Sequence, residues 1–165
     1  MAVKPKSKAK TIFMEGYLKW PKFLKSNMDT KFNEDGVYQT EFYPSSKDEL
    51  SKLLDEAKSR NKEIRVGDPS DGEGYGLGKF VRLKRNNVNR IEEFSGPPTV
   101  VHLDEGSSHG EPWDYNTDGL LGNGTKVKVK VVMYGEGHMA GVRLEKVGVL
   151  DHVAYGDPAE FADAF

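Results

Sequence analysis

Polar and apolar residues alternate strictly over 126–131, the first part of the stretch 126–134, which reads KVKVKVVMY. A period of two is typical of a β-strand with one buried face. The inward face of this predicted strand carries Val127, Val129 and Val131. Its outward face carries Lys126, Lys128, Lys130 and Tyr134. The pattern therefore predicts a row of ammonium groups beside an aromatic ring.

Shorter apolar patterns predict further strands at 11–20, 36–43, 79–85, 99–103 and 140–150. A turn at Asn86-Asn87 leads into 88–94. One helix is predicted over 46–60, because Ser46 and Glu49 have capping-box spacing and an apolar stripe follows them. The stripe consists of Leu50, Leu53, Leu54 and Ala57. These elements predict a mainly β fold, an OB-fold-like antiparallel barrel with one amphipathic helix.

The composition supports a single domain with many turns. The chain has 165 residues, of which 18 are glycine and 8 are proline. It has no cysteine, which excludes disulfides, thiolate zinc sites and cysteine nucleophiles. No apolar run has the length of a transmembrane helix, so we expect a cytoplasmic protein with no membrane association. We also expect no cofactor.

The net charge of −2 hides an uneven distribution. Eight lysines lie within residues 1–31, against Glu15 and Asp29. The last residues carry acids without a base. We therefore predict a basic flexible arm at 1–10, a binding domain at 11–155 and an acidic tail at 156–165.

Three predicted strands present an aromatic residue and at least one cation on their outward faces. Such faces suit single-stranded nucleic acid, which offers phosphates and flat bases. The predicted nucleic-acid-binding residues are Tyr17, Lys19, Phe80, Arg82, Lys84, Lys126, Lys128, Lys130 and Tyr134. The alternative interpretation of the lysines is a solvated strand face or a protected sheet edge. Trp20 and Phe23, beside Lys22 and Lys25, are further binding candidates in the following loop, although a core position is the favoured interpretation of Trp20. Tyr75, in the glycine-rich run 72–78, is interpreted as a residue that flanks the predicted binding groove.

Two other functions remain open. The segment containing His102, Asp104, Glu105, His109, Glu111 and Asp114 has side chains that a metal-dependent nuclease requires, although their spacing matches no defined ligand motif. A protein-interaction module without nucleic-acid affinity is the other alternative.

Four features, in this order, carry a family resemblance. They are Tyr17-Leu-Lys-Trp-Pro21 with Asp29-Thr-Lys-Phe-Asn33, then Gly36-Val-Tyr38, then Gly122-Asn-Gly-Thr-Lys-Val-Lys-Val129, and the acidic tail that finishes on Phe165. Together they resemble the single-stranded DNA-binding proteins of tailed phages, an OB-fold type with a phenylalanine-ended tail.

The resemblance implies a protein that coats single strands during phage DNA replication and recombination in the host cytoplasm, and that is not an enzyme. It also implies that the tail recruits replication proteins such as polymerase or helicase. The tail residues concerned are Asp157, Glu160, Phe161, Asp163 and Phe165. Homo-oligomerisation is possible.

Overall fold

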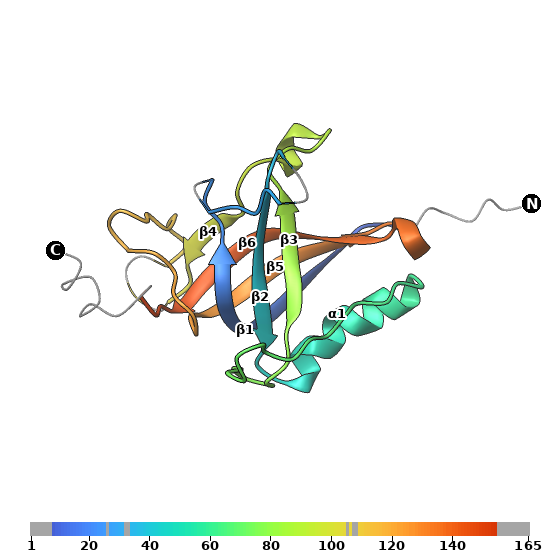
Figure 1. The fold of residues 1–165 in the computed structure, drawn as a ribbon, viewed down its shortest axis with the longest axis horizontal. Helices are drawn as coiled ribbons and strands as arrows, with labels where there is room; N and C mark the ends of the chain where they lie inside the picture. The colour runs from blue at the N-terminus through green and yellow to red at the C-terminus, as the bar shows by residue number, and fades with distance from the viewer. Residues whose placement is uncertain (1–7, 26, 32–33, 105, 107–108, 155–165) are drawn as a thin grey trace, which may run out of the picture.

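The computed structural model describes residues 8–25, 27–31, 34–104, 106 and 109–154. Six strands form one strongly curved sheet, and the helix α1 (Lys47–Ser59) lies against it (Figure 1). The strands are β1 (Lys10–Lys22), β2 (Val37–Pro44), β3 (Val81–Asn86), β4 (Thr99–His102), β5 (Lys126–Tyr134) and β6 (Gly141–Asp151). The predicted mainly β fold with one amphipathic helix is confirmed.

The strands lie in the order β3-β2-β1-β5-β6-β4, so β1 and β5 form the middle of the sheet. Every neighbouring pair is antiparallel except β4 and β6, which run parallel. The sheet is therefore mainly antiparallel, as the sequence predicts, with one parallel pair. The fold is OB-like but not a closed barrel.

The bend in β1 wraps the sheet around its core. Residues Lys10 to Tyr17 pair with β5, and β1 pairs with β2 from Gly16 onward. A Cβ atom at Gly16 would lie 2.2 Å from the carbonyl oxygen of Tyr43. Only glycine allows β1 and β2 to approach this closely where β1 changes partner.

The core fills the concave side of the sheet. Alternate residues of β1 and β5 point inward and are buried, as the period of two predicts. They include Ile12, Met14, Leu18, Val127, Val129 and Val131. Leu50, Leu53 and Ala57 of α1 complete this core, and Leu54 packs against it half-buried.

The helix begins as its sequence predicts. The Ser46 hydroxyl accepts a hydrogen bond from the backbone N–H of Glu49 at 3.3 Å. The Glu49 carboxylate accepts from the backbone N–H of Glu15 at 2.9 Å. The start of α1 is thereby joined to β1.

Arg85 joins β3 to β6 where the sheet does not close. These strands contact each other, but no ladder pairs them within the described residues. The Arg85 side chain is 6% exposed and lies 3.4 Å from Glu145 on β6. Its guanidinium donates to carbonyl oxygens of Glu93, Ser95, Gly96 and Leu144 at 2.9–3.3 Å. One side chain thus links the two strands in place of backbone pairing.

The predicted strands agree with the observed ones in position but not always in their bounds. The strand over 126–134 has the predicted bounds, and the other strands differ at their ends. Within 88–94 the structure has a short 3-10 helix, Glu92–Phe94, and a second one spans Gly137–Met139. None of the helices in the described part of the chain is long and apolar enough to span a membrane.

Candidate nucleic-acid interface

The convex face of β1, β2 and β3 carries a row of aromatic rings. Tyr17 lies opposite Tyr43 of β2 and, on its other side, opposite Lys126 of β5. Phe80, just before β3, lies 5.5 Å from Tyr43 between ring centroids. Tyr75 covers this row, with its ring centroid 6.0 Å from that of Tyr17 and 5.7 Å from that of Tyr43. Tyr17, Tyr75 and Phe80 remain partly exposed.

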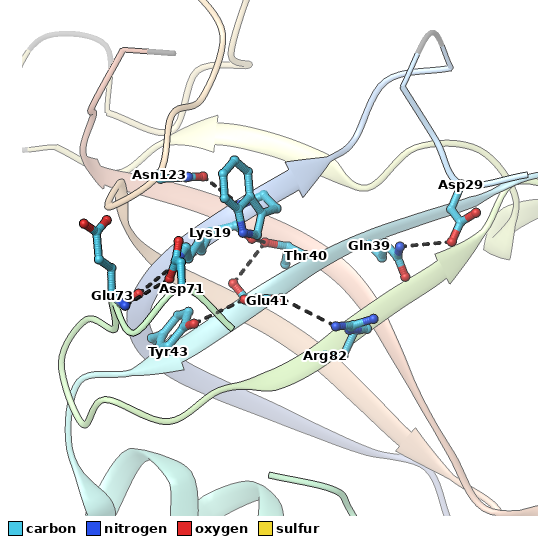
Figure 2. Close-up of polar contacts among 11 residues, drawn as sticks. Lys19, Asp29, Gln39, Thr40, Glu41, Tyr43, Asp71, Glu73, Arg82 and Asn123 are labelled. Atoms are coloured by element: carbon cyan, nitrogen blue, oxygen red, sulfur yellow. Dashed lines mark hydrogen bonds and ion pairs between the residues drawn. The ribbon is translucent and has the colours of Figure 1, made fainter. Parts of the chain in front are cut away.

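Two polar rows run beside the aromatic row, and Figure 2 shows the contacts of the first. In the first, Glu41 of β2 lies between Lys19 of β1 and Arg82 of β3. The Arg82 guanidinium lies 3.5 Å from the Glu41 carboxylate, and the Tyr43 hydroxyl donates to Glu41 at 3.2 Å. Burial, with Glu41 adding to it, raises the pKa of Tyr43 well above its ordinary value, so the hydroxyl keeps its proton.

The second polar row consists of Lys22, Gln39 and Lys84, and its lysines are partly or fully exposed. Gln39 donates to Asp29 at 3.1 Å, which fixes its amide at the end of the groove. Together the rows place three cationic side chains, those of Lys22, Arg82 and Lys84, beside the aromatic rings on one face. We call this surface of β1, β2 and β3 the groove.

Lys19 is the exception among the predicted cations. Its side chain is on the convex face but is only 1% exposed, because the 67–78 loop covers it. The ammonium group pairs with the Asp71 carboxylate and donates to the carbonyl oxygen of Glu73 at 2.7 Å (Figure 2). The hydrogen bond from Lys19, followed by the one that the Glu73 backbone N–H donates to Asp71 at 2.9 Å, lowers the pKa of Asp71 below its ordinary value. The expectation that Lys19 is solvent-facing is corrected: its charge is already neutralised by the loop.

Trp20 lies at the surface, although the sequence analysis favours a core position over a binding role for it. Its side chain is 51% exposed, and its φ angle of 52° is in the left-handed region. The pairing of β1 with β2 shifts register between Lys19 and Lys22, so Trp20 sits on a bulge. Its backbone N–H donates to Asn123 at 2.7 Å, which holds the bulge in place. The following Pro21 was the available signal, because proline has no backbone N–H to donate to the ladder and is found in sheets mainly at edges and bulges.

A hollow of about 370 Å³ lies beside Trp20 on this convex face. Its lining consists of Trp20, Lys22, Gln39, Thr40, Glu41 and Arg82. The hollow thus combines one flat aromatic ring, two cations, one amide and one carboxylate. Such a surface accommodates a flat, partly apolar ring with an attached anion.

The lysines of β5 extend this face away from the groove. Lys126 lies opposite Tyr17, Lys128 opposite Glu15, and Lys130 opposite Phe13. The strand is paired on both sides, with β1 and with β6. Protection of a sheet edge therefore does not explain its lysines.

Tyr134 does not join the other predicted residues. It ends β5, eight residues beyond Lys126, which is about 27 Å along an extended strand. Its ring lies 5.6 Å from the guanidinium of Arg143. Five of the predicted binding residues therefore lie together in the groove: Tyr17, Phe80, Arg82, Lys84 and Lys126. Lys128 and Lys130 follow Lys126 along β5, and Tyr134 is at the far end of that strand.

The segment considered for a metal site makes ordinary hydrogen bonds instead. His102 pairs with Asp118 at 2.9 Å and lies 3.8 Å from Asp104, whose carbonyl oxygen bonds His109 at 2.8 Å. No group of three metal-ligating side chains occurs among the described residues. Glu105 lies outside them, as do residues 1–7 of the arm and the tail residues Asp157, Glu160, Phe161, Asp163 and Phe165.

Comparison with known proteins finds solved structures of similar fold. No protein-family model matches the chain, and no curated protein does. A C-terminally truncated single-stranded DNA-binding protein from bacteriophage Enc34 has a similar structure, with a TM-score of 0.58 at 13% sequence identity, over 94% of this chain and 99% of that chain. That phage protein in complex with single-stranded DNA gives 0.54 at 11% identity, over 88% of this chain and 89% of that one. A further structure of the Enc34 protein gives 0.53 at 13% identity, over 94% and 89%. At these identities the likeness shows that the fold is shared.

Proposed function

We propose that this chain binds single-stranded DNA without reading its sequence. The observation that carries the proposal is the convex face of β1, β2 and β3, where exposed Trp20 and a row of aromatic rings lie beside Lys22, Arg82 and Lys84. Aromatic rings stack on any base and cations track any phosphate, so this chemistry is indifferent to sequence. The Enc34 protein, whose fold is similar, is described as binding single-stranded DNA, which supports the proposal.

In this proposal Trp20 and Tyr17 stack bases, and Phe80 borders them. Lys22, Lys84 and Lys126 neutralise phosphates. Arg82 is held by Glu41 on one side and lies 5.8 Å from the Phe80 ring, so its planar group is oriented before DNA arrives. Duplex DNA would bind less well, because its bases are already stacked on one another.

We further propose that the chain coats and protects single strands during phage DNA replication and recombination in the host cell. The tail residues Asp157, Glu160, Phe161, Asp163 and Phe165 would recruit replication proteins such as polymerase or helicase. Their acidic and aromatic composition is the support for this part.

Charge reversal at the groove tests the binding site. We expect Arg82→Glu/Lys84→Glu and Lys126→Glu/Lys128→Glu each to weaken binding to a dT oligonucleotide at least tenfold, or about 1.4 kcal/mol. The matched control is Lys47→Glu/Lys58→Glu on α1, which makes the same charge change at two exposed positions. It should bind within about twofold of wild type, since it lies outside the groove. Fluorescence anisotropy titrations at fixed salt give the affinities.

Two results would count against the site. If a folded groove variant binds as wild type does, the strand concerned is not part of the interface. If the helix control loses as much affinity as the groove variants, overall charge and not this face decides the binding.

A further inference from the structure

A second hollow lies on the convex face, beyond the β1–β2–β3 groove. It has a volume of about 280 Å³. Its lining consists of Phe13, Val101, Leu103, Lys128, Lys130, Lys146 and Gly148. Phe13 is 49% exposed, although aromatic rings are usually buried more completely. The hollow therefore has an apolar floor surrounded by ammonium groups.

Gly148 shapes this hollow. A Cβ atom at position 148 would lie 2.0 Å from Cδ1 of Leu103. Glycine thus allows the Leu103 side chain to lie directly against β6. Leu103 and Phe13 then form apolar walls beside the lysines.

Lys130 and Lys146 do not occupy positions that stabilise the sheet. Lys130 and Lys146 lie directly opposite each other on β5 and β6, an arrangement in which like charges repel. Both strands are paired on both sides, so the lysines do not protect an edge. Within the described residues neither Lys130 nor Lys146 forms an ion pair. Repelling cations beside an exposed ring are typical of a site for an anion with a flat apolar part.

Lys128 links the hollow to the groove. Its ammonium lies 5.7 Å from the centroid of the Phe13 ring, within the range of a cation–π contact. Lys128 lies directly opposite Glu15 on β1, and its charge helps to lower the pKa of Glu49 on α1. The next outward cation of β5 is Lys126, which is opposite Tyr17 of the groove. Tyr17 and Phe13 are four residues apart on β1, about 13 Å along the strand.

We propose that this hollow is a second nucleotide subsite. A single strand that leaves the groove at Tyr17 follows the lysines of β5, stacks a base on Phe13 and places phosphates near Lys130 and Lys146. This inference rests on the proposed function and adds to it a path around the convex side of the sheet. It also predicts that the full site needs a longer strand than the groove alone.

Oligonucleotides of two lengths test this path. The probes are dT strands of about 5 and about 16 nucleotides, which span the usual site sizes of OB-folds. The variants are Phe13→Ala and Lys146→Gln, with Lys58→Gln on α1 as the matched control. All three positions are exposed, and thermal unfolding checks that each variant is folded.

We expect both variants to weaken binding of the long strand about fivefold to tenfold and to leave the short strand unaffected. For Lys146→Gln, the slope of log affinity against log salt should become shallower by about 0.7 with the long strand only. Lys58→Gln should change neither.

The outcomes separate this inference from the proposed function. Unchanged binding of the long strand by both variants, with wild-type binding intact, overturns the second subsite alone. Equal losses for the short and long strands also overturn it, because the hollow would then be part of the first groove. Failure of wild type to bind either strand overturns the proposed function and the subsite with it.

Discussion

At the scale of residues, Trp20 is the most informative side chain. A left-handed backbone costs a residue with a Cβ atom about 1–2 kcal/mol, and an indole exposed to water adds little burial in return. Trp20 nevertheless has φ of 52° and is half-exposed on a bulge. A strained backbone persists only where the surrounding fold holds it in place, and such residues cluster at binding and active sites. The bulge turns the indole towards the hollow beside Arg82.

Two substitutions separate binding from strain at this position. Trp20→Ala and Trp20→Gly should both weaken single-stranded DNA binding about tenfold, since each removes one stacking ring. Trp20→Gly should be more stable than Trp20→Ala by about 1 kcal/mol, because glycine adopts positive φ without a Cβ clash. Affinity is measured by titration and stability by urea unfolding. Wild-type affinity in both variants would remove Trp20 from the interface.

The sequence predicts inward and outward positions well within regular strands. Val127, Val129 and Val131 are buried and Lys128 is exposed, as alternation requires. Trp20 and Lys19 escaped prediction for two different reasons. The bulge at Trp20 breaks the period locally, and the cover over Lys19 comes from Asp71, 52 residues away. A distant partner leaves no mark in a local pattern, and the bulge is marked only by the proline that follows Trp20.

At the scale of elements, the 67–78 loop controls what the groove exposes. It pairs Asp71 with the buried ammonium of Lys19 and lays Tyr75 over Tyr17. The Leu77 N–H donates to the carbonyl oxygen of Pro44 at 2.9 Å, which joins the end of the loop to the end of β2. The sequence analysis identified this run as glycine-rich but could not show that it packs on β1.

The Asp71 contact predicts a specific acid sensitivity. Its pKa is lowered in the folded state, chiefly by the bond from Lys19, whereas in the unfolded chain it is near the ordinary value of 3.8. The carboxylate therefore stabilises the fold above that value, and this contribution is lost as the pH falls through the lower, folded-state pKa. Between about pH 7 and about pH 3, wild type should lose more unfolding free energy than Asp71→Asn, which cannot titrate. Urea unfolding at the two pH values measures both losses; equal losses would mean that the Lys19–Asp71 bond does not stabilise the fold.

At the scale of the whole molecule, one curved sheet presents its convex face as a continuous surface. Periodicity and glycine content predicted a small curved β fold with one helix, and the structure confirms it. The parallel pairing of β4 with β6 and the linkage of β3 to β6 through Arg85 could not be predicted, because both depend on strand order. The register of β5 against β1 places Lys126 opposite Tyr17 and so in the groove, whereas Tyr134 is at the other end of β5.

The measurement that tests the central claim most directly is a titration of the whole chain with a fluorescent dT oligonucleotide at two salt concentrations. A duplex of equal length is titrated alongside. We predict tight binding that weakens with salt and prefers the single strand, because the groove offers cations for phosphates and rings for unstacked bases. Absence of binding at low salt, or equal affinity for the duplex, would contradict the account.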